Sequence, residues 1–155
     1  MTESQRATSA DTGLPAARGT YVLVLRLPRR TTADLGAVRG LELARGWYLY
    51  VGSAFGPGGL AARVGRHLRA DKRPRWHVDH LRALAAPVAV WASVSSARLE
   101  HRWAERLAAA GLAGIPRVGA SDCRCATHLF FAPRAPDDAL FAALGGSAAR
   151  VWPCT

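Results

Sequence analysis

Three stretches of the chain are mainly apolar and rich in aromatic and β-branched residues, and aromatic residues occupy alternate positions in the second of them. This pattern predicts strands, over residues 19–27 (GTYVLVLRL), 47–53 (WYLYVGS) and 87–94 (PVAVWASV). Weaker signals predict a short strand near residues 41–44 and a further strand over residues 125–131. Together the three strong stretches supply enough apolar surface for a small sheet.

Two other stretches repeat apolar residues at the spacing of a helix. Leu60, Val64 and Leu68 recur every four residues and predict a helix that begins after the glycine-rich turn at residues 55–59. A second set predicts a helix over residues 96–110, with Leu99, Trp103 and Leu107 on one side. Residues 137–144 show a weaker amphipathic pattern.

The order strand, strand, helix, strand, helix predicts an α/β (α+β) fold, with a small central antiparallel or mixed β-sheet flanked by helices. The chain has 155 residues, which fits one domain. Residues 1–18 lack an apolar period and are expected to form a flexible leader. We assign the domain to residues 19–133 and a C-terminal extension to residues 134–155.

Charge narrows the class of partner. The formal net charge is +10, and residues 19–133 carry all of it, with 17 basic and 7 acidic side chains. A domain with this positive charge favours binding to a polyanion, and we expect the partner to be DNA. No membrane partner is expected, because the longest apolar run is too short to span a bilayer. The three cysteines indicate reduced thiols and a cytoplasmic location.

Candidate chemical groups lie on the two predicted helices. Arg63 and His67 are four residues apart, on the strip beside the apolar face. Further basic residues, Arg66, Arg69 and Arg73 among them, extend the positive charge. Glu100 lies at the border of the second apolar stripe, where a carboxylate can cap the helix, stay at the surface or bind a hard cation. The glycine-rich turn lacks the spacing of a nucleotide-binding loop.

Five positions in one order resemble the GIY-YIG nuclease superfamily. They are Gly19-Thr-Tyr21, Tyr50-Val-Gly52, Arg63, His67 and Glu100. The resemblance runs from residue 19 to about residue 110. The segments YVGSAFGPGGLAARVGRHLR, RWHVDHL and ASDCRCATHLFF resemble a small single-domain prokaryotic branch of that superfamily, whose role is poorly defined.

The resemblance implies a divalent-metal-dependent endonuclease that hydrolyses DNA phosphodiester bonds. Tyr21 or Tyr50 would help to activate water, and Arg63 would bind the scissile phosphate. His67 matches a histidine that some members carry one turn after the arginine. Glu100 would hold one cation, Mg²⁺ or Mn²⁺. The expected nucleic-acid contacts come from Gly52, Arg66, Arg69, Arg73 and Trp76, of which Trp76 is the candidate for stacking on bases.

The chain departs from the pattern of the superfamily in three ways. Twenty-eight residues separate Tyr21 from Tyr50, so an inserted strand or loop is expected there. Thr20 and Val51 replace isoleucines. The chain contains no asparagine, so an asparagine that some members carry after the glutamate helix is missing.

Histidines and cysteines outside these positions are candidate zinc ligands. The residues concerned are His77, His80, Cys123, Cys125 and His128. They lack the paired C-x₂-C spacing of a strong zinc site. We therefore favour buried free thiols and hydrogen-bonded histidines over a zinc site.

Three functions compete on these grounds. The first is a nuclease that acts in DNA repair or processing. The second is a non-catalytic nucleic-acid-binding module with the same fold, and the third is a zinc-stabilised interaction protein. The retained tyrosine, arginine and glutamate residues favour the first, since binding alone would not require Glu100 in a cationic site.

Overall fold

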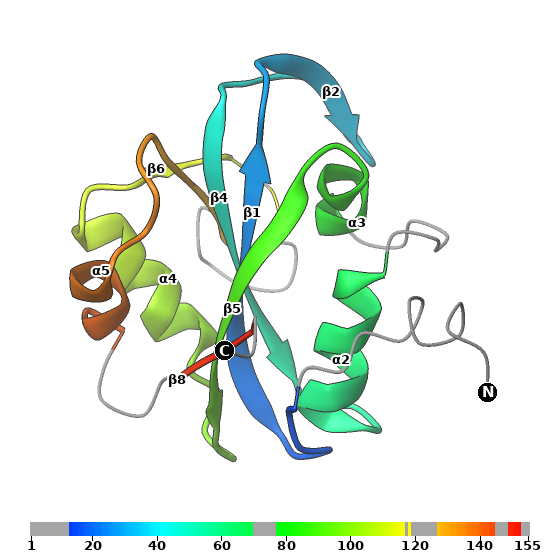
Figure 1. Cartoon of the computed structure of the whole chain (residues 1–155), viewed down its shortest axis with the longest axis vertical. Helices are drawn as coiled ribbons and strands as arrows, with labels where there is room; N and C mark the ends of the chain where they lie inside the picture. Colours follow the sequence, from blue (N-terminus) through cyan, green and yellow to red (C-terminus); the bar gives the residue numbers. More distant parts are fainter. Residues whose placement is uncertain (1–12, 70–76, 117, 119–126, 145–148, 153–155) are drawn as a thin grey trace.

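In the computed structural model one sheet lies between two layers of helices (Figure 1). The structure describes residues 13–69, 77–116, 118, 127–144 and 149–152, the last as backbone only. The sheet has six strands in the order β6-β7-β4-β1-β5-β8, and every neighbouring pair is antiparallel. The predicted α/β (α+β) fold, with a central antiparallel sheet flanked by helices, is therefore confirmed.

The three strongly predicted strands form the centre of the sheet. They are β1 (Gly19–Leu27), β4 (Gly46–Ala54) and β5 (Ala86–Val94). β1 lies between the other two, and Tyr21 is opposite Gly52 of β4 and Ala92 of β5. Because successive side chains of a strand point to opposite faces, β1 supplies Tyr21 to one core and Val22 to the other.

The segment between the two tyrosines folds as a separate hairpin. It consists of β2 (Thr31–Leu35) and β3 (Val38–Leu43), which pair only with each other among the described strands. The expectation of an inserted strand or loop is confirmed. The predicted short strand near residues 41–44 corresponds to β3, which begins earlier, at Val38. β2 was not predicted, because its polar and charged residues hide the single buried leucine, Leu35.

Helices cover both faces of the sheet. α2 (Gly59–Leu68) and α3 (His77–Arg82) lie on one side of it in Figure 1, and α4 (Glu100–Ala109) and α5 (Asp138–Ala142) lie on the other. The predicted helix over residues 96–110 begins later, at Glu100. The Leu99 N–H group, just before this helix, donates to the Thr20 hydroxyl of β1 at 3.3 Å. Neither periodicity nor length predicted α3, which has six residues.

The remaining strands complete the edges of the sheet. They are β6 (Ala113–Gly114), β7 (Leu129–Ala132) and β8 (Ala149–Trp152). Of the predicted strand over residues 125–131, the first two residues lie outside the described part, and the observed strand begins only at Leu129. β6 and β8 were not predicted, since each is short. No described helix is long and apolar enough to cross a membrane.

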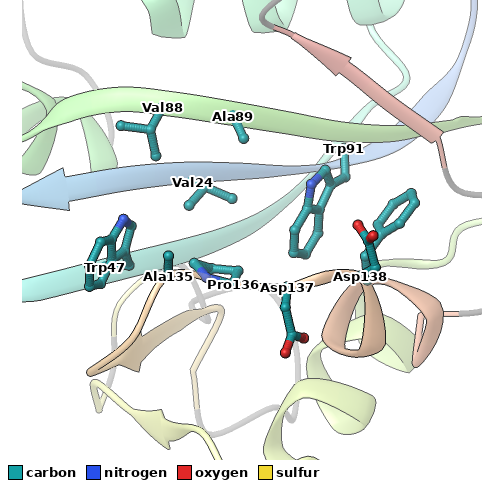
Figure 2. Close-up of a pocket in the computed structure, with 10 residues that line it drawn as sticks. Val24, Trp47, Val88, Ala89, Trp91, Ala135, Pro136, Asp137 and Asp138 are labelled. Atoms are coloured by element: carbon teal, nitrogen blue, oxygen red, sulfur yellow. The ribbon is translucent and has the colours of Figure 1, made fainter.

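A hollow of about 280 Å³ lies on the face of the sheet that α4 and α5 cover. Figure 2 shows Trp47 and Trp91 at its two ends, with Ala135 and Pro136 between them. The Asp137 carboxylate at its rim accepts the Leu140 N–H group at 2.9 Å and so caps α5. Most of the residues that line the hollow are apolar, and it lies on the face of the sheet opposite to Tyr21.

Candidate functional site

The centre of the candidate site is a buried contact between Tyr21 and His67. The Tyr21 hydroxyl lies 2.7 Å from His67 Nε2, and both side chains are at most 2 % exposed. Tyr21 comes from β1, and His67 from the last turn of α2. His67 faces inward because it follows Val64 by three residues, on the face that packs against the sheet.

Gly52 makes room for this contact. It is opposite Tyr21 in the sheet, and a Cβ atom at this position would collide with the tyrosine hydroxyl. The glycine of Tyr50-Val-Gly52 is buried. We predicted Gly52 as a nucleic-acid contact; in the structure it lies beneath the Tyr21 ring.

Tyr50 lies beside this pair but nearer the surface. Its ring centroid is 6.5 Å from that of Tyr21 and 6.0 Å from that of His67. The side chain is half-buried, whereas Tyr21 is 1 % exposed. The two tyrosines, which the sequence alone cannot rank, therefore differ in their access to solvent.

Burial keeps both phenols protonated. It raises the pKa of Tyr21 well above 10, and Tyr50 and Glu100 add to this, whereas Arg63 opposes it by its charge and a side-chain hydrogen bond. Burial likewise raises the pKa of Tyr50 to about 12, again with Glu100 adding and Arg63 opposing. Neither tyrosine is a base at neutral pH without further positive charge beside it.

Ser53 connects the predicted phosphate-binding arginine to the predicted metal ligand. Its carbonyl oxygen accepts a hydrogen bond from Arg63 Nη1 at 3.3 Å, and its hydroxyl donates to Glu100 Oε1 at 3.2 Å. Ser53 is three residues after Tyr50, so alternation along β4 turns its side chain toward α4 and away from α2. One strand thereby brings a guanidinium and a carboxylate to the same end of the sheet.

Glu100 also lies beside two imidazoles. Its Oε2 is 3.7 Å from His128 Nδ1, and the His128 ring centroid is 5.9 Å from that of His101. Burial lowers the pKa of His128, with Glu100 opposing and His101 adding. The neutral ring is the form of histidine that binds metal ions.

The donor set at Glu100 fits a hard divalent cation. A carboxylate that is 17 % exposed can bind the ion while leaving positions open for water and phosphate oxygens. The Ser53 hydroxyl and the neutral His128 ring are further donors nearby. Among the described residues, no group of three or more His, Cys, Asp or Glu side chains lies so that it could hold a metal ion.

On the other side of His67 lies a buried ion pair. Arg66 Nη1 is 3.0 Å from both carboxylate oxygens of Asp79, and Asp79 Oδ1 is 3.8 Å from His67 Nδ1. Asp79 is 3 % exposed, and the Arg66 side chain is 21 % exposed. We predicted Arg66 as a nucleic-acid contact, and in the structure its guanidinium is directed at Asp79.

The glycine-rich turn before α2 binds part of the chain itself. Two N–H groups in the first turn of α2, those of Leu60 and Ala61, donate to the carbonyl oxygens of Ala17 and Pro15 at 2.9 and 3.1 Å. Residues 13–18, placed in the leader by the sequence analysis, therefore cap this helix. These two donors are not available to a phosphate.

The other predicted residues are spread over the molecule. Arg69 is exposed at the end of α2. His77 and His80 lie beside Gly36 in the turn of the β2–β3 hairpin, on a different element from His128. Four predicted residues lie outside the described part of the chain: Arg73, Trp76, Cys123 and Cys125.

Sequence reasoning missed the roles of Ser53 and Asp79. Strand alternation in WYLYVGS could have indicated that Ser53 faces away from the tyrosines. Asp79 lies in the WHVDH segment, but its contact with α2 depends on how α3 packs.

A family model described as a domain of unknown function, DUF123, matches residues 20–147. The chain belongs to the DUF123 family. The matched region includes every site residue named above from Tyr21 to His128. Comparisons with curated proteins and with solved structures give no match for this DUF123 protein.

Proposed function

We propose that this DUF123 protein is a divalent-metal-dependent endonuclease of the GIY-YIG type, which hydrolyses phosphodiester bonds in DNA. The observation that carries the proposal is the bridge through Ser53, which connects Arg63 to Glu100. Hydrolysis of a phosphodiester needs positive charge on the phosphate and a site for a cation, within reach of one substrate. The resemblance of five ordered positions to that superfamily supports the same assignment.

Arg63 would bind the scissile phosphate. Its guanidinium is half-buried and held by the Ser53 carbonyl, so little side-chain freedom is lost when the phosphate binds. Glu100, with Ser53 and His128 beside it, would hold Mg²⁺ or Mn²⁺. When bound, such a cation supplies charge stabilisation and lowers the pKa of neighbouring water and phenol groups.

We assign the contact with the attacking water to Tyr50 and a supporting role to Tyr21. Tyr50 is the more accessible of the two, and its pKa of about 12 leaves a neutral hydroxyl that can orient a water molecule. Tyr21 is 1 % exposed, so its hydroxyl acts on His67 and Arg63 rather than on DNA. We expect this division of roles to appear as different effects of the two Tyr→Phe changes.

The test is nicking of supercoiled plasmid in the presence of Mg²⁺ or Mn²⁺, with a gel shift on the same proteins. Glu100→Gln keeps the size of the side chain and removes the charge that attracts the cation. Arg63→Ala removes the donor to the phosphate, a loss that typically lowers the rate by ~10²–10³-fold. Both variants should fold and bind DNA but lose metal-dependent cleavage.

Matched controls come from the same helix as Glu100. Glu105 and Arg102 are exposed on α4, so Glu105→Gln and Arg102→Ala change charge in the same way away from Ser53. Both should cleave like the wild type. If the wild type cuts no DNA with any divalent metal, or if Glu100→Gln cuts normally, the proposal fails and the non-catalytic binding module takes its place.

A further inference from the structure

Four charged or polar groups form a continuous chain from the interior to the proposed phosphate-binding arginine. Arg66 contacts Asp79 at 3.0 Å, Asp79 is 3.8 Å from His67 Nδ1, and His67 Nε2 is 2.7 Å from the Tyr21 hydroxyl. Tyr21 in turn accepts a side-chain hydrogen bond from Arg63. The proposed function involves Tyr21 and Arg63, at one end of this series of contacts, and assigns no role to Asp79.

The contact between Asp79 and His67, at 3.8 Å, is longer than a hydrogen bond and acts through charge. The direction of the hydrogen bonds follows from what each group can donate. A guanidinium has only donors, so the Tyr21 oxygen is the acceptor toward Arg63. The single proton of the neutral Tyr21 hydroxyl is then available to His67 Nε2, which must be unprotonated to accept it. A neutral imidazole carries one proton, which this network assigns to Nδ1, on the side of Asp79.

Asp79 is suited to hold that proton in place. Its side chain is 1 % exposed, and a carboxylate so deeply buried stays ionised only with a compensating charge. Arg66 supplies this charge, because its Nη1 lies 3.0 Å from both oxygens. The negative charge of an ionised carboxylate 3.8 Å away favours an N–H group on the facing ring nitrogen over a lone pair there.

We propose that Asp79 is a positioning residue that holds His67 in the tautomer protonated at Nδ1, and so fixes Tyr21 and Arg63. In the opposite tautomer, the Nε2–H group would donate to the Tyr21 oxygen and compete there with Arg63. The Tyr21 proton would then have to turn away from His67. The consequence for DNA cleavage rests on the proposed function; the tautomer itself does not.

The first test measures the tautomer directly, by nitrogen-15 NMR of the His67 side chain at a pH at which the ring is neutral. In the wild type, the chemical shifts should identify Nδ1 as the protonated nitrogen. In Asp79→Asn, whose amide can donate to Nδ1, the proton should shift toward Nε2. Asp138→Asn, an exposed aspartate on α5, should match the wild type.

A wild-type ring protonated at Nε2, or at both nitrogens across the range in which the protein is folded, would overturn the proposal. So would an unchanged tautomer in folded Asp79→Asn. If that variant does not fold, the wild-type spectrum still decides. This measurement needs no cleavage, so it stands even if the nuclease proposal fails.

The second test separates positioning from folding. In plasmid-nicking kinetics, Asp79→Asn should lower kcat by roughly 10–100-fold, as the loss of a partner behind a functional histidine typically does. KM and the gel-shift affinity should change less than about threefold, because Asp79 touches no surface that DNA reaches. An equal loss in the Asp138→Asn control, or a loss confined to KM, would count against the proposal.

Discussion

The Ser53 hydroxyl donates to the Glu100 carboxylate at 3.2 Å, although the two residues are 47 positions apart in the chain. The same serine accepts Arg63 through its carbonyl oxygen. β4 thus sets the distance between the proposed phosphate ligand and the proposed metal ligand through one residue.

Ser53→Ala should lower the rate of metal-dependent cleavage and leave DNA binding intact. The hydrogen bond to a charged acceptor is worth ~1.5 kcal/mol, which corresponds to about a tenfold loss. The backbone bond to Arg63 remains, so the effect should be smaller than that of Glu100→Gln. Ser96→Ala, at an exposed serine before α4, is the matched control. Wild-type cleavage by Ser53→Ala would show that the bridge has no functional role.

Arg66 and Arg69 should respond differently to replacement by alanine. Arg66→Ala leaves the buried Asp79 carboxylate without its partner and should lower the free energy of unfolding by about 2–4 kcal/mol. Arg69 is exposed, so Arg69→Ala should lower stability less than Arg66→Ala and reduce the slope of log affinity for DNA against log salt by ~1. Denaturant titration and gel shifts at several salt concentrations measure the two effects. A stable Arg66→Ala variant with weakened DNA binding would show that Arg66 contacts DNA and does not stabilise the fold through Asp79.

Alkaline pH should destabilise the fold through its tyrosines. Burial raises the pKa of Tyr48 and Tyr50 to about 12 and that of Tyr21 well above its ordinary value, whereas in the unfolded chain phenols ionise near pH ~10. Between those pH values the folded state binds more protons than the unfolded state, so the free energy of unfolding falls as pH rises above ~10.

Near-ultraviolet absorbance of phenolate measures this directly, because the chain has three tyrosines. Native protein at about pH 10.5 should show little phenolate, and protein in denaturant should show most of it. Tyr50→Phe should flatten the loss of stability with pH. Ionisation of the native tyrosines near pH ~10 would contradict the buried arrangement.

Two glycines of one turn make a matched pair for stability. Gly59 has a φ of +54°, and a Cβ atom there would collide with the Ala17 carbonyl group that caps α2. Gly59→Ala should therefore cost about 2 kcal/mol or more. At Gly56 no atom lies within 4 Å of the point that a Cβ atom would occupy, so Gly56→Ala should be neutral or stabilising by up to ~1 kcal/mol. Equal effects in thermal unfolding would show that residues 13–18 do not cap this helix.

The sequence predicts those parts of the site that depend on local periodicity. Enrichment in aromatic and β-branched residues places Tyr21 and Tyr50 on strands, and helical spacing places Arg63 and His67 one turn apart. Both signals are strong because the elements are nine or ten residues long.

The parts that the sequence did not predict depend on contacts between distant elements. α3 has six residues, too few for a helical period, and its Asp79 acquires a role only when it packs against α2. In the sequence, Ser53 does not differ from other serines on strands. Its role depends on Glu100, at the start of α4, which lies beside it in the fold. No local pattern indicates that a tyrosine ring from the neighbouring strand fills the space beside Gly52.

The β2–β3 hairpin limits how this site could be built into another protein. Leu35 and Leu43 of the hairpin share one core with Val78 and Leu81 of α3. A version of the fold with a shorter connection between its two tyrosines would lose the surface on which α3 rests. Asp79 could therefore not be introduced into such a fold by a single substitution. The hairpin and α3 would have to be inserted together with the aspartate.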